Sequence, residues 1–140
     1  MHSIQRLGKA QVIETVPENI FDGIIDFFSQ RINSLQNSGV SSERIILDPG
    51  MGFFLGSNPE TSIYVLKNIF RVKEYFKLPI LVSVSRKSFL GTIVGRGVNE
   101  RTPATLAAEI YISYMGVDYI RTHDVRALSD ALKVLGMLNC

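Results

Sequence analysis

Three short segments of the sequence carry the polar side chains that could bind or transform a ligand. The first is Asp48, the second is the run from Ser85 to Ser88, and the third contains Arg121 and His123. Each follows a short apolar run of the kind that forms a buried parallel strand. Because the carboxyl ends of parallel strands share one rim, we expect a carboxylate, a lysine, an arginine, a histidine and a serine to face one pocket. Such a set can bind a polar heteroaromatic ring through the carboxylate and lysine, and an anion through the arginine, histidine and serine.

The same residues do not predict a metal centre or a nucleophilic triad. Side chains of the metal-ligand types are few and differ in charge. No serine lies in a Gly-x-Ser-x-Gly turn, and His123 has no evident serine or cysteine partner. Simpler interpretations stay open, since Asp48 could merely initiate the turn that follows it, and Arg86 and Lys87 could be a solvated pair.

The elements that would position these residues alternate along the chain as strands and helices. Apolar residues at three- and four-residue steps predict the helices, and caps, prolines and glycines mark their ends. The predicted helices run from Pro17 to Asn37, from Pro59 to Lys77, from Ala104 to Met115 and from Ala127 to Leu138. The predicted strands are Arg44–Leu47, Pro79–Val84 and Val117–Ile120. Asn58, Thr102 and Asp124 are the predicted helix caps, and a glycine-containing loop is predicted from Gly91 to Thr102.

The predicted strands are strongly apolar and alternate with helices. This pattern indicates an α/β fold of parallel (β/α) units. Two architectures fit that pattern, an open doubly wound sheet and a (β/α)8 barrel. A doubly wound sheet usually has a glycine-rich phosphate loop after its first strand, and this sequence has no Gly-x-Gly-x-x-Gly or Walker pattern. The sequence therefore favours a barrel of the TIM type, of which this chain would supply about half.

The length and composition fit one ordinary globular domain. The chain has 140 residues, of which 46% are hydrophobic and 20% are charged, and its formal net charge is +2. That charge is too small to argue for nucleic acid or an anionic membrane as a partner. The sequence shows no apolar run long enough to span a bilayer and no secretory signal at its start. Its single cysteine, Cys140, cannot form an intrachain disulfide, which fits a cytoplasmic location.

The three polar segments together resemble those of dihydropteroate synthase, a family of (β/α)8 barrels. The matching segments are Asp48–Phe53, Ser85–Phe89 and Arg121–Val125, which stand in the family's order and at its spacings. Met1-His2 also resembles the Met-His at the end of the family's fifth strand. The resemblance covers essentially the whole chain but only the C-terminal half of the family's barrel. It implies that residues 1–140 are a single pterin-binding domain fragment, with about strands six to eight, their flanking helices, and the end of strand five at residue 1.

The resemblance implies a transferase of folate biosynthesis. The family condenses 6-hydroxymethyl-7,8-dihydropterin diphosphate with p-aminobenzoate, giving 7,8-dihydropteroate and pyrophosphate. Stabilising the departing pyrophosphate is a task for cations and needs no protein nucleophile. The implied site residues are Lys87, Arg121 and His123 for catalysis, Asp48, Lys87, Arg121, Met1 and Ser83 for the pterin, Ser88 and Phe53 with Lys87 for p-aminobenzoate, and Arg121 and His123 for the diphosphate.

Mg²⁺ is the cofactor that the resemblance implies. In the family it helps pyrophosphate to depart, which leaves a pterin carbocation that the arylamine attacks. The family's first strand supplies the Asn associated with Mg²⁺, so we expect the protein ligand outside this chain and no metal ligand within it. Two positions depart from the family's pattern, because Leu55 stands where a lysine is common and Ser83 where many members have glycine. Neither change removes a principal contact, but both leave room for an altered substrate preference.

Two further hypotheses stay open beside the synthase. One is a non-catalytic half barrel that binds a pterin or an anion, since half of the family's site lies outside this chain. The other is a relative of the pterin-binding methyltransferases, although the Ser-Arg-Lys-Ser and Arg-x-His-Asp segments favour the synthase. Because a half barrel has two open strand edges, we expect this chain either to pair with another copy as a homodimer or to fold loosely alone. The expected partners are otherwise small-molecule substrates, with no nucleic acid and no membrane.

Overall fold

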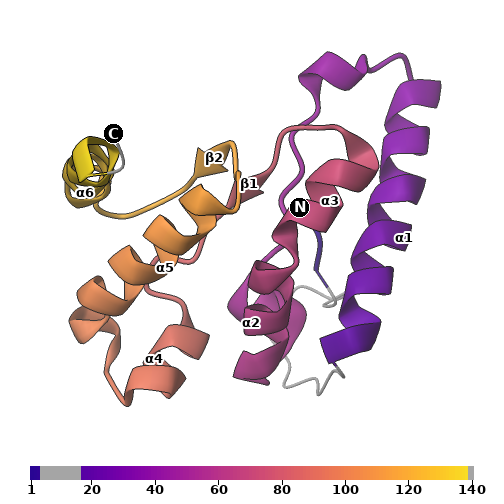
Figure 1. Cartoon of the computed structure of the whole chain (residues 1–140). Coiled ribbons are helices and arrows are strands. Elements are labelled where there is room, and N and C mark those ends of the chain that lie inside the picture. The colour runs from indigo at the N-terminus through magenta and orange to yellow at the C-terminus, as the bar shows by residue number, and fades with distance from the viewer. Residues whose placement is uncertain (4–16, 139–140) are drawn as a thin grey trace.

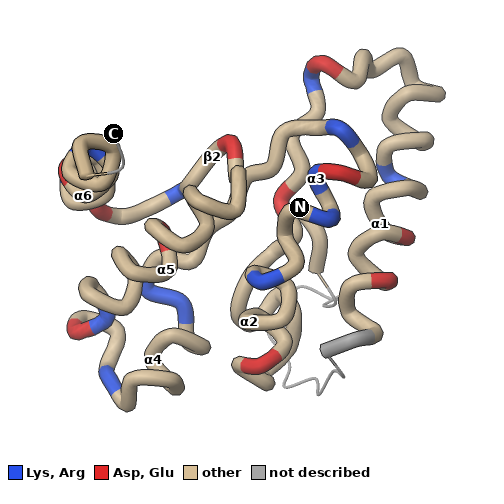
Figure 2. Tube along the Cα trace, viewed as in Figure 1, with Lys and Arg blue, Asp and Glu red and all other residues tan. Residues whose placement is uncertain are grey.

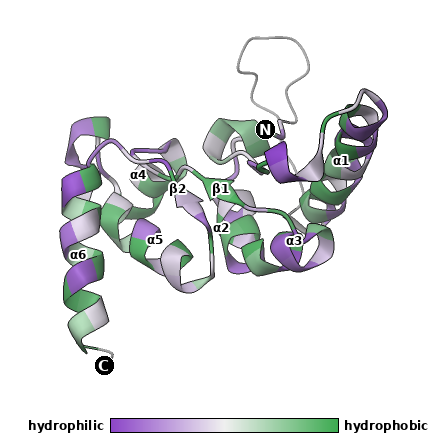
Figure 3. Ribbon diagram, turned by 90° about the horizontal axis from the view of Figure 1, so that it is seen from above, coloured by the Kyte–Doolittle hydropathy of each residue, from purple (hydrophilic) through white to green (hydrophobic). Residues whose placement is uncertain are grey.

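The computed structural model describes residues 1–3 and 17–138, which fold as helices around a short parallel sheet (Figure 1). The helices α1, α2 and α3 lie on one side of the strands, and α5 and α6 lie on the other (Figure 1, Figure 3). In chain order the elements are α1 (Pro17–Asn37), η1 (Ser42–Arg44), η2 (Gly52–Leu55), α2 (Pro59–Lys67), α3 (Ile69–Phe76), β1 (Leu81–Val82), α4 (Ser88–Val94), η3 (Val98–Glu100), α5 (Thr102–Tyr114), β2 (Tyr119–Ile120) and α6 (Val125–Leu138).

Helix α1 has the length that the sequence predicts, and its apolar stripe faces the core. Ile20, Phe21, Ile24 and Phe28 are buried, because residues at three- and four-residue steps share one helix face. Burial decreases along the helix, and Leu35 on the last turn is exposed. Helix α1 therefore packs mainly through its first turns, against α2.

The three predicted strands are parallel, as expected, but shorter than predicted. β1 and β2 pair over both of their residues, and the first predicted strand keeps one parallel bridge, from Leu47 to Ile80. Arg44, predicted to begin that strand, ends η1 instead. The order across the sheet follows the order along the chain, with helices in each crossover. This is the connectivity of parallel (β/α) units.

Asp118, just before β2, is hydrogen-bonded to Ile80, just before β1, and to Lys73 on α3. Its two carboxylate oxygens accept hydrogen bonds from Ile80 N at 2.9 Å and from Lys73 Nζ at 2.7 Å. Lys73 also donates to Gly116 O at 2.8 Å. Gly116 has φ +78° and ends α5 in the left-handed conformation predicted for it. These bonds fix the amino ends of the strands, and so the register of their carboxyl ends.

Two helical segments differ from the prediction. The helix expected from Pro59 to Lys77 is divided at Asn68, which is non-helical and whose Nδ2 donates to Tyr64 O at 2.9 Å. The segment after Lys87, expected to become a loop at Gly91, forms α4 instead. Phe89 and Leu90, the second and third residues of α4, are buried in the core, and this burial stabilises the helix.

Two of the three predicted caps are present. Asn58 Oδ1 accepts from Glu60 N, and Asp124 Oδ1 accepts from Ala127 N, both at 2.9 Å, at the starts of α2 and α6. Thr102 is the first residue of α5 rather than its cap. The helix predicted to begin at Ala104 therefore begins two residues earlier, while the helix itself is confirmed.

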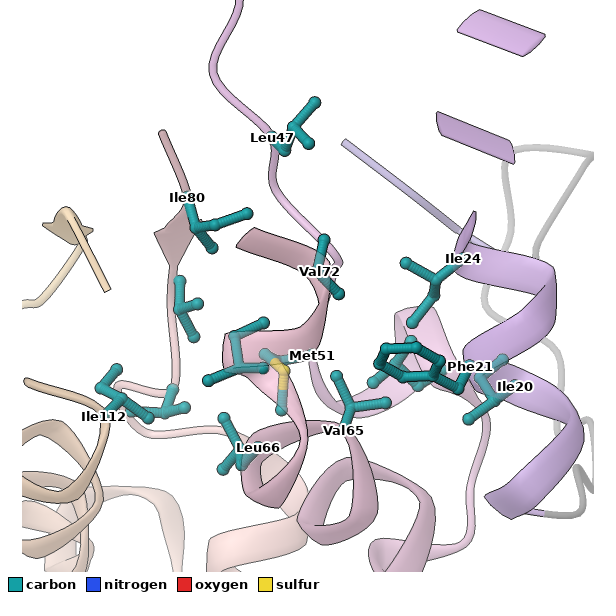
Figure 4. Packing of buried hydrophobic residues seen from close by; sticks show 14 of the residues in the cluster. Ile20, Phe21, Ile24, Leu47, Met51, Val65, Leu66, Val72, Ile80 and Ile112 are labelled. Atoms are coloured by element: carbon teal, nitrogen blue, oxygen red, sulfur yellow. The ribbon is translucent and has the colours of Figure 1, made fainter. Parts of the chain in front are cut away.

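The hydrophobic core lies between the strands and helices α1, α2 and α3 (Figure 4). Ile80, Met51 and Val65 are almost fully buried there, and Ile112 reaches the same cluster from α5. Helix α6 buries only Leu128 and is apolar over much of its exposed surface (Figure 3). Over the residues that the structure describes, none of the helices combines the length and the apolar character that crossing a bilayer needs.

Candidate functional site

A pocket of about 520 Å³ lies at the carboxyl ends of β1 and β2. Basic residues occur just before α4 and just after β2 (Figure 2), and those of both segments line the pocket. The structure thus brings Lys87, Arg121, His123 and Ser83, four of the predicted site residues, to one place. The residues lining the pocket are Ser83, Ser85, Arg86, Lys87, Val98, Arg121, Thr122 and His123.

His123 has a serine partner, contrary to the sequence-based expectation. Its Nδ1 lies 2.8 Å from Ser85 Oγ, and its backbone N–H donates to the same oxygen at 3.2 Å. Parallel pairing of β1 with β2 brings the two turns together, since Arg121 N donates to Val82 O at 3.0 Å just before them. The contact orients the imidazole of His123. Ser85 is almost fully buried, and both residues line the pocket.

Lys87 lies between the pocket and the turn that follows Asp48. Its Nζ is 4.8 Å from the centre of the Phe54 ring, a cation–π contact. Partial burial lowers the pKa of Lys87, nearby Arg121 lowers it further, and the carboxylate of Asp48 opposes both effects. Lys87 therefore lies within electrostatic range of both predicted pterin-binding partners, Asp48 and Arg121.

Asp48 does initiate a turn, and the same turn holds the start of the described chain. Its Oδ1 accepts from Gly50 N at 2.9 Å, while its carbonyl accepts from His2 N at 2.7 Å. The ring of His2 is buried, and its Nδ1 lies 3.1 Å from Pro49 O. Burial lowers the pKa of His2. Met1, predicted to contact the pterin, is exposed beside this turn.

The two residues predicted for p-aminobenzoate beside Lys87, Ser88 and Phe53, lie in different environments. A Cβ on Gly52 would lie 3.6 Å from Ser88 Oγ and 3.5 Å from Lys87 Cδ, so Ser88 and Lys87 share one side of the glycine turn. Phe53 has an exposed side chain, whereas Phe54 stacks on Lys87. Phe54, to which the family resemblance assigned no role, is thus the aromatic side chain in contact with Lys87.

The two departures from the family pattern lie in different environments. Leu55 is fully buried in the core, so it adds no side chain to the pocket. Ser83 is buried but lines the pocket, where a glycine would leave more room. The substitution that can reshape the ligand site is therefore Ser83 rather than Leu55.

Glu109 is a buried carboxyl group that the sequence analysis missed. It lies on α5, and its side chain is almost fully buried. Burial raises the pKa of Glu109, while the side chain of Thr122 lowers it and the nearby negative charge of Asp124 raises it further. A signal was present in the sequence, because Glu109 is the one charged residue in the segment that forms α5.

The side chains around the pocket do not fit a Mg²⁺ site. Mg²⁺ requires oxygen ligands in near-octahedral geometry, whereas the lining contains the cations of Arg86, Lys87 and Arg121. Among residues 1–3 and 17–138, no group of three or more His, Cys, Asp or Glu side chains could hold a metal ion. Mg²⁺ bound by a ligand outside this chain stays a prediction.

Comparison with known proteins identifies the family of this arrangement. Residues 1–123 match the family model described as pterin binding enzyme. The chain is 58% identical over 134 residues to the dihydropteroate synthase type-3 of Escherichia coli, an alignment that covers 96% of this chain and 51% of that protein. The chain spans about half the length of the curated relatives it matches.

Solved structures show the same fold. The dihydropteroate synthase of Anaplasma phagocytophilum with bound 6-hydroxymethylpterin-monophosphate has a TM-score of 0.81 and 35% identity, and the match covers 91% of this chain and 48% of that one. The enzyme of Coxiella burnetii in complex with pteroic acid has a TM-score of 0.80 and 30% identity, covering 89% and 45%. These matches confirm the predicted resemblance and the predicted fold class, parallel (β/α) units of a partial TIM-type barrel.

Proposed function

The chain belongs to the pterin binding enzyme family, and we propose that it forms part of the active site of a dihydropteroate synthase. The proposed reaction condenses 6-hydroxymethyl-7,8-dihydropterin diphosphate with p-aminobenzoate, a step of folate biosynthesis. One observation carries the proposal, the meeting of Lys87, Arg121 and His123 in one pocket at the carboxyl ends of β1 and β2. It is supported by the relatives, since proteins that match nearly all of this chain are dihydropteroate synthases.

The charges of the pocket suit the departure of a diphosphate. In the proposed reaction the bond between the pterin methylene carbon and the diphosphate oxygen breaks, and its electron pair leaves with pyrophosphate. Arg121 and His123, after β2, would hold that anion, and Lys87 with Asp48 would bind the polar edge of the pterin. The amine nitrogen of p-aminobenzoate then bonds to the methylene carbon and loses a proton. No protein nucleophile takes part in these steps.

The second substrate would enter beside the glycine turn. Ser88 and Lys87 lie against Gly52, with Phe54 over the lysine, so this wall offers a hydroxyl, a cation and an aromatic face to an aromatic carboxylate. The relative from Coxiella burnetii was solved with pteroic acid. We propose that Ser88 receives the carboxylate, that Phe53 borders the entrance, and that Met1 and Ser83 contact the pterin.

The complete activity would need more than this chain supplies. The chain covers about half the length of its curated relatives, so we propose that the remaining barrel strands and the Mg²⁺ ligand come from residues outside it. A homodimer and a cytoplasmic location belong to the same proposal. A second candidate follows from the same observation, a half barrel that binds the pterin diphosphate without turnover.

A dihydropteroate assay separates the two candidates. The 140-residue chain is incubated with both substrates and Mg²⁺, beside Lys87→Ala and, as a matched control, Lys67→Ala on the exposed end of α2. Turnover that Lys87→Ala abolishes and Lys67→Ala leaves intact supports a complete site. Binding of the pterin diphosphate without turnover supports the second candidate, and neither turnover nor binding contradicts both.

A further inference from the structure

Arg101 stands immediately before α5, at a position where an arginine does not help its own helix. The N-cap of a helix favours small polar side chains that accept hydrogen bonds from the first turn, and a positive charge there opposes the helix dipole. Arg101 makes no side-chain bond of this capping kind. The reason for an arginine here therefore lies in its contacts outside α5.

The guanidinium of Arg101 bridges two segments that line the pocket. Its Nη1 donates to Arg86 O at 3.0 Å, in the turn before α4, and its Nε donates to Arg96 O at 3.2 Å, in the loop after α4. Arg86 lines the pocket itself, and so does Val98 in the loop that follows Arg96. One side chain thus connects the segments at both ends of α4, at the edge of the pocket.

The turn at Arg86 has a backbone conformation that needs such support. Arg86 has φ +57°, in the left-handed region that residues with a side chain adopt only at a cost. Its N–H donates at 3.0 Å to Oγ1 of Thr105, a buried residue one helical turn beyond Arg101. The peptide groups on both sides of Arg86 are therefore held by side chains from α5 and its cap. Lys87 follows directly, so this turn sets the direction in which its side chain leaves the backbone.

Gly91 leaves the space that the guanidinium occupies. A Cβ built on Gly91 would overlap the Nε, Cζ and Nη2 atoms of Arg101. Gly91 lies inside α4 and does not have a left-handed φ that would require glycine. Helix propensity by itself would favour alanine at such a position. The packing of Arg101 thus accounts for the glycine.

We propose that Arg101 is a positioning residue for Lys87. Seated against Gly91, its guanidinium holds the turn at Arg86 and the loop after α4 in one arrangement. Arg101 is not among the residues that line the pocket, so it acts through these two segments. The inference rests on the proposed function in one respect, since the ligand that Lys87 is positioned to bind is taken to be the pterin diphosphate. The geometry of the turn does not depend on that ligand.

Gly91→Ala tests this assignment in a chain that should still fold. The added methyl group would displace the flexible end of Arg101 rather than backbone, and alanine suits a helix interior. The matched control is Gly23→Ala inside α1, where nothing lies within 4 Å of a Cβ. Amide hydrogen exchange is measured by NMR, with the β1 amides as the reference for global stability. We expect the Arg86 amide to exchange about tenfold faster in Gly91→Ala, because a hydrogen bond from a charged donor is lost, and at an unchanged rate in Gly23→Ala.

Arg101→Lys supplies a second variant if Gly91→Ala does not fold. Lysine keeps the positive charge but lacks the planar fork that reaches two carbonyl oxygens at once. It should speed exchange of the Arg86 amide as Gly91→Ala does. An Arg86 amide that exchanges equally in the unmodified chain and both variants, or only in step with the β1 amides, would overturn the proposal.

Calorimetric binding of 6-hydroxymethyl-7,8-dihydropterin diphosphate supplies the functional readout. We expect an affinity about tenfold weaker in Gly91→Ala and Arg101→Lys, and within about twofold of the unmodified chain in Gly23→Ala. Faster exchange at Arg86 with unchanged affinity would also overturn the positioning role. If the unmodified chain binds no pterin diphosphate, the proposed function fails, while the exchange data still decide whether Arg101 holds the turn.

Discussion

Lys87 stands where the proposed pterin and p-aminobenzoate sites would meet. It faces Phe54 on one side and the charges of Asp48 and Arg121 on the other. A cation held this close to a second cation is a cost to the fold, because partial burial and Arg121 both disfavour its charged form. Such a cost is expected at a ligand site, where the incoming anion would relieve it.

Replacing Lys87 should therefore separate stability from binding. The folded-state pKa lies below the ordinary value of 10.5, so the cost is fully present at neutral pH and disappears as the pH rises toward 10.5. We expect Lys87→Met to be at least as stable as the unmodified chain in urea at pH 7, with the difference narrowing in alkaline buffer. The variant should lose pterin diphosphate binding. A Lys87→Met chain that is clearly less stable at pH 7, with the exposed Lys67→Met unchanged, would contradict this account.

Glu109 predicts the opposite pH dependence. Its folded-state pKa lies above the ordinary value of 4.5, so its contribution favours the fold below pH 4.5 and is lost as the pH rises through the folded-state pKa. Thr122 and Asp124 are the polar groups that face it. We expect the free energy of unfolding of Glu109→Gln, measured in urea, not to decline over this pH range. At pH 7 this variant should be more stable than the unmodified chain. The exposed Glu74→Gln serves as control, and parallel pH profiles for Glu109→Gln and the unmodified chain would rule the effect out.

At the residue scale, the sequence predicted which charged residues follow the strands, but it did not predict which side chains contact one another. Asp48, Lys87, Arg121 and His123 could be selected because each follows an apolar strand. The contact of His123 with Ser85 depends on the register of β1 and β2, which neither strand encodes by itself.

At the scale of elements, the turn from Asp48 to Phe54 is closely packed around Gly50. Gly50 has φ +73°, and a Cβ there would lie 2.5 Å from His2 O and 2.9 Å from Phe54 Cβ. Only a residue without a side chain allows this approach. The turn thus ties the Met1-His2 segment, the Asp48 carboxylate and the aromatic wall over Lys87 into one unit.

Substitution of this glycine should cost more than its conformation alone. Gly39 provides the matched control, since its φ is +86° and nothing lies within 4 Å of a Cβ built there. We expect Gly39→Ala to lower the free energy of unfolding by about 1 kcal/mol. Gly50→Ala should lower it by about 2 kcal/mol more, because the backbone of His2 must also move. Equal losses in a urea titration would show that the turn is not closely packed.

The sequence predicted the elements better than their lengths. Helices α1, α5 and α6 follow from apolar periodicity, and the parallel pairing follows from the alternation of helices and strands. Helix α4 was missed because Gly91 indicates a loop, whereas burial of Phe89 and Leu90 decides the conformation. The break at Asn68 depends on a side-chain bond that periodicity does not reveal.

At the scale of the whole molecule, the described helices are not covered equally. Helices α1, α2 and α3 enclose the core, whereas α6 lies at the far end with apolar side chains exposed (Figure 1, Figure 3). Val125, Val134, Met137 and Leu138 are each more than half exposed on α6. Side chains of this kind are usually covered by another part of a barrel or by another chain.

The predicted homodimer can be tested through this helix. If a second copy covers α6, sedimentation of the chain at micromolar concentration should give a dimer. Replacing Val134 and Leu138 by lysine, one turn apart, should then shift it toward monomer, because two charges would be buried. A compact monomer at the same concentration, without the substitutions, would contradict the homodimer.

The most direct test of the central claim is calorimetric binding of 6-hydroxymethyl-7,8-dihydropterin diphosphate to the 140-residue chain. Arg121→Met removes the cation at the end of β2, and Arg126→Met, on the exposed face of α6, serves as the matched control. We predict binding by the unmodified chain and by Arg126→Met, and an affinity at least about tenfold weaker in Arg121→Met. No binding by the unmodified chain, or equal affinity in all three, would contradict the assignment of this pocket to the pterin diphosphate.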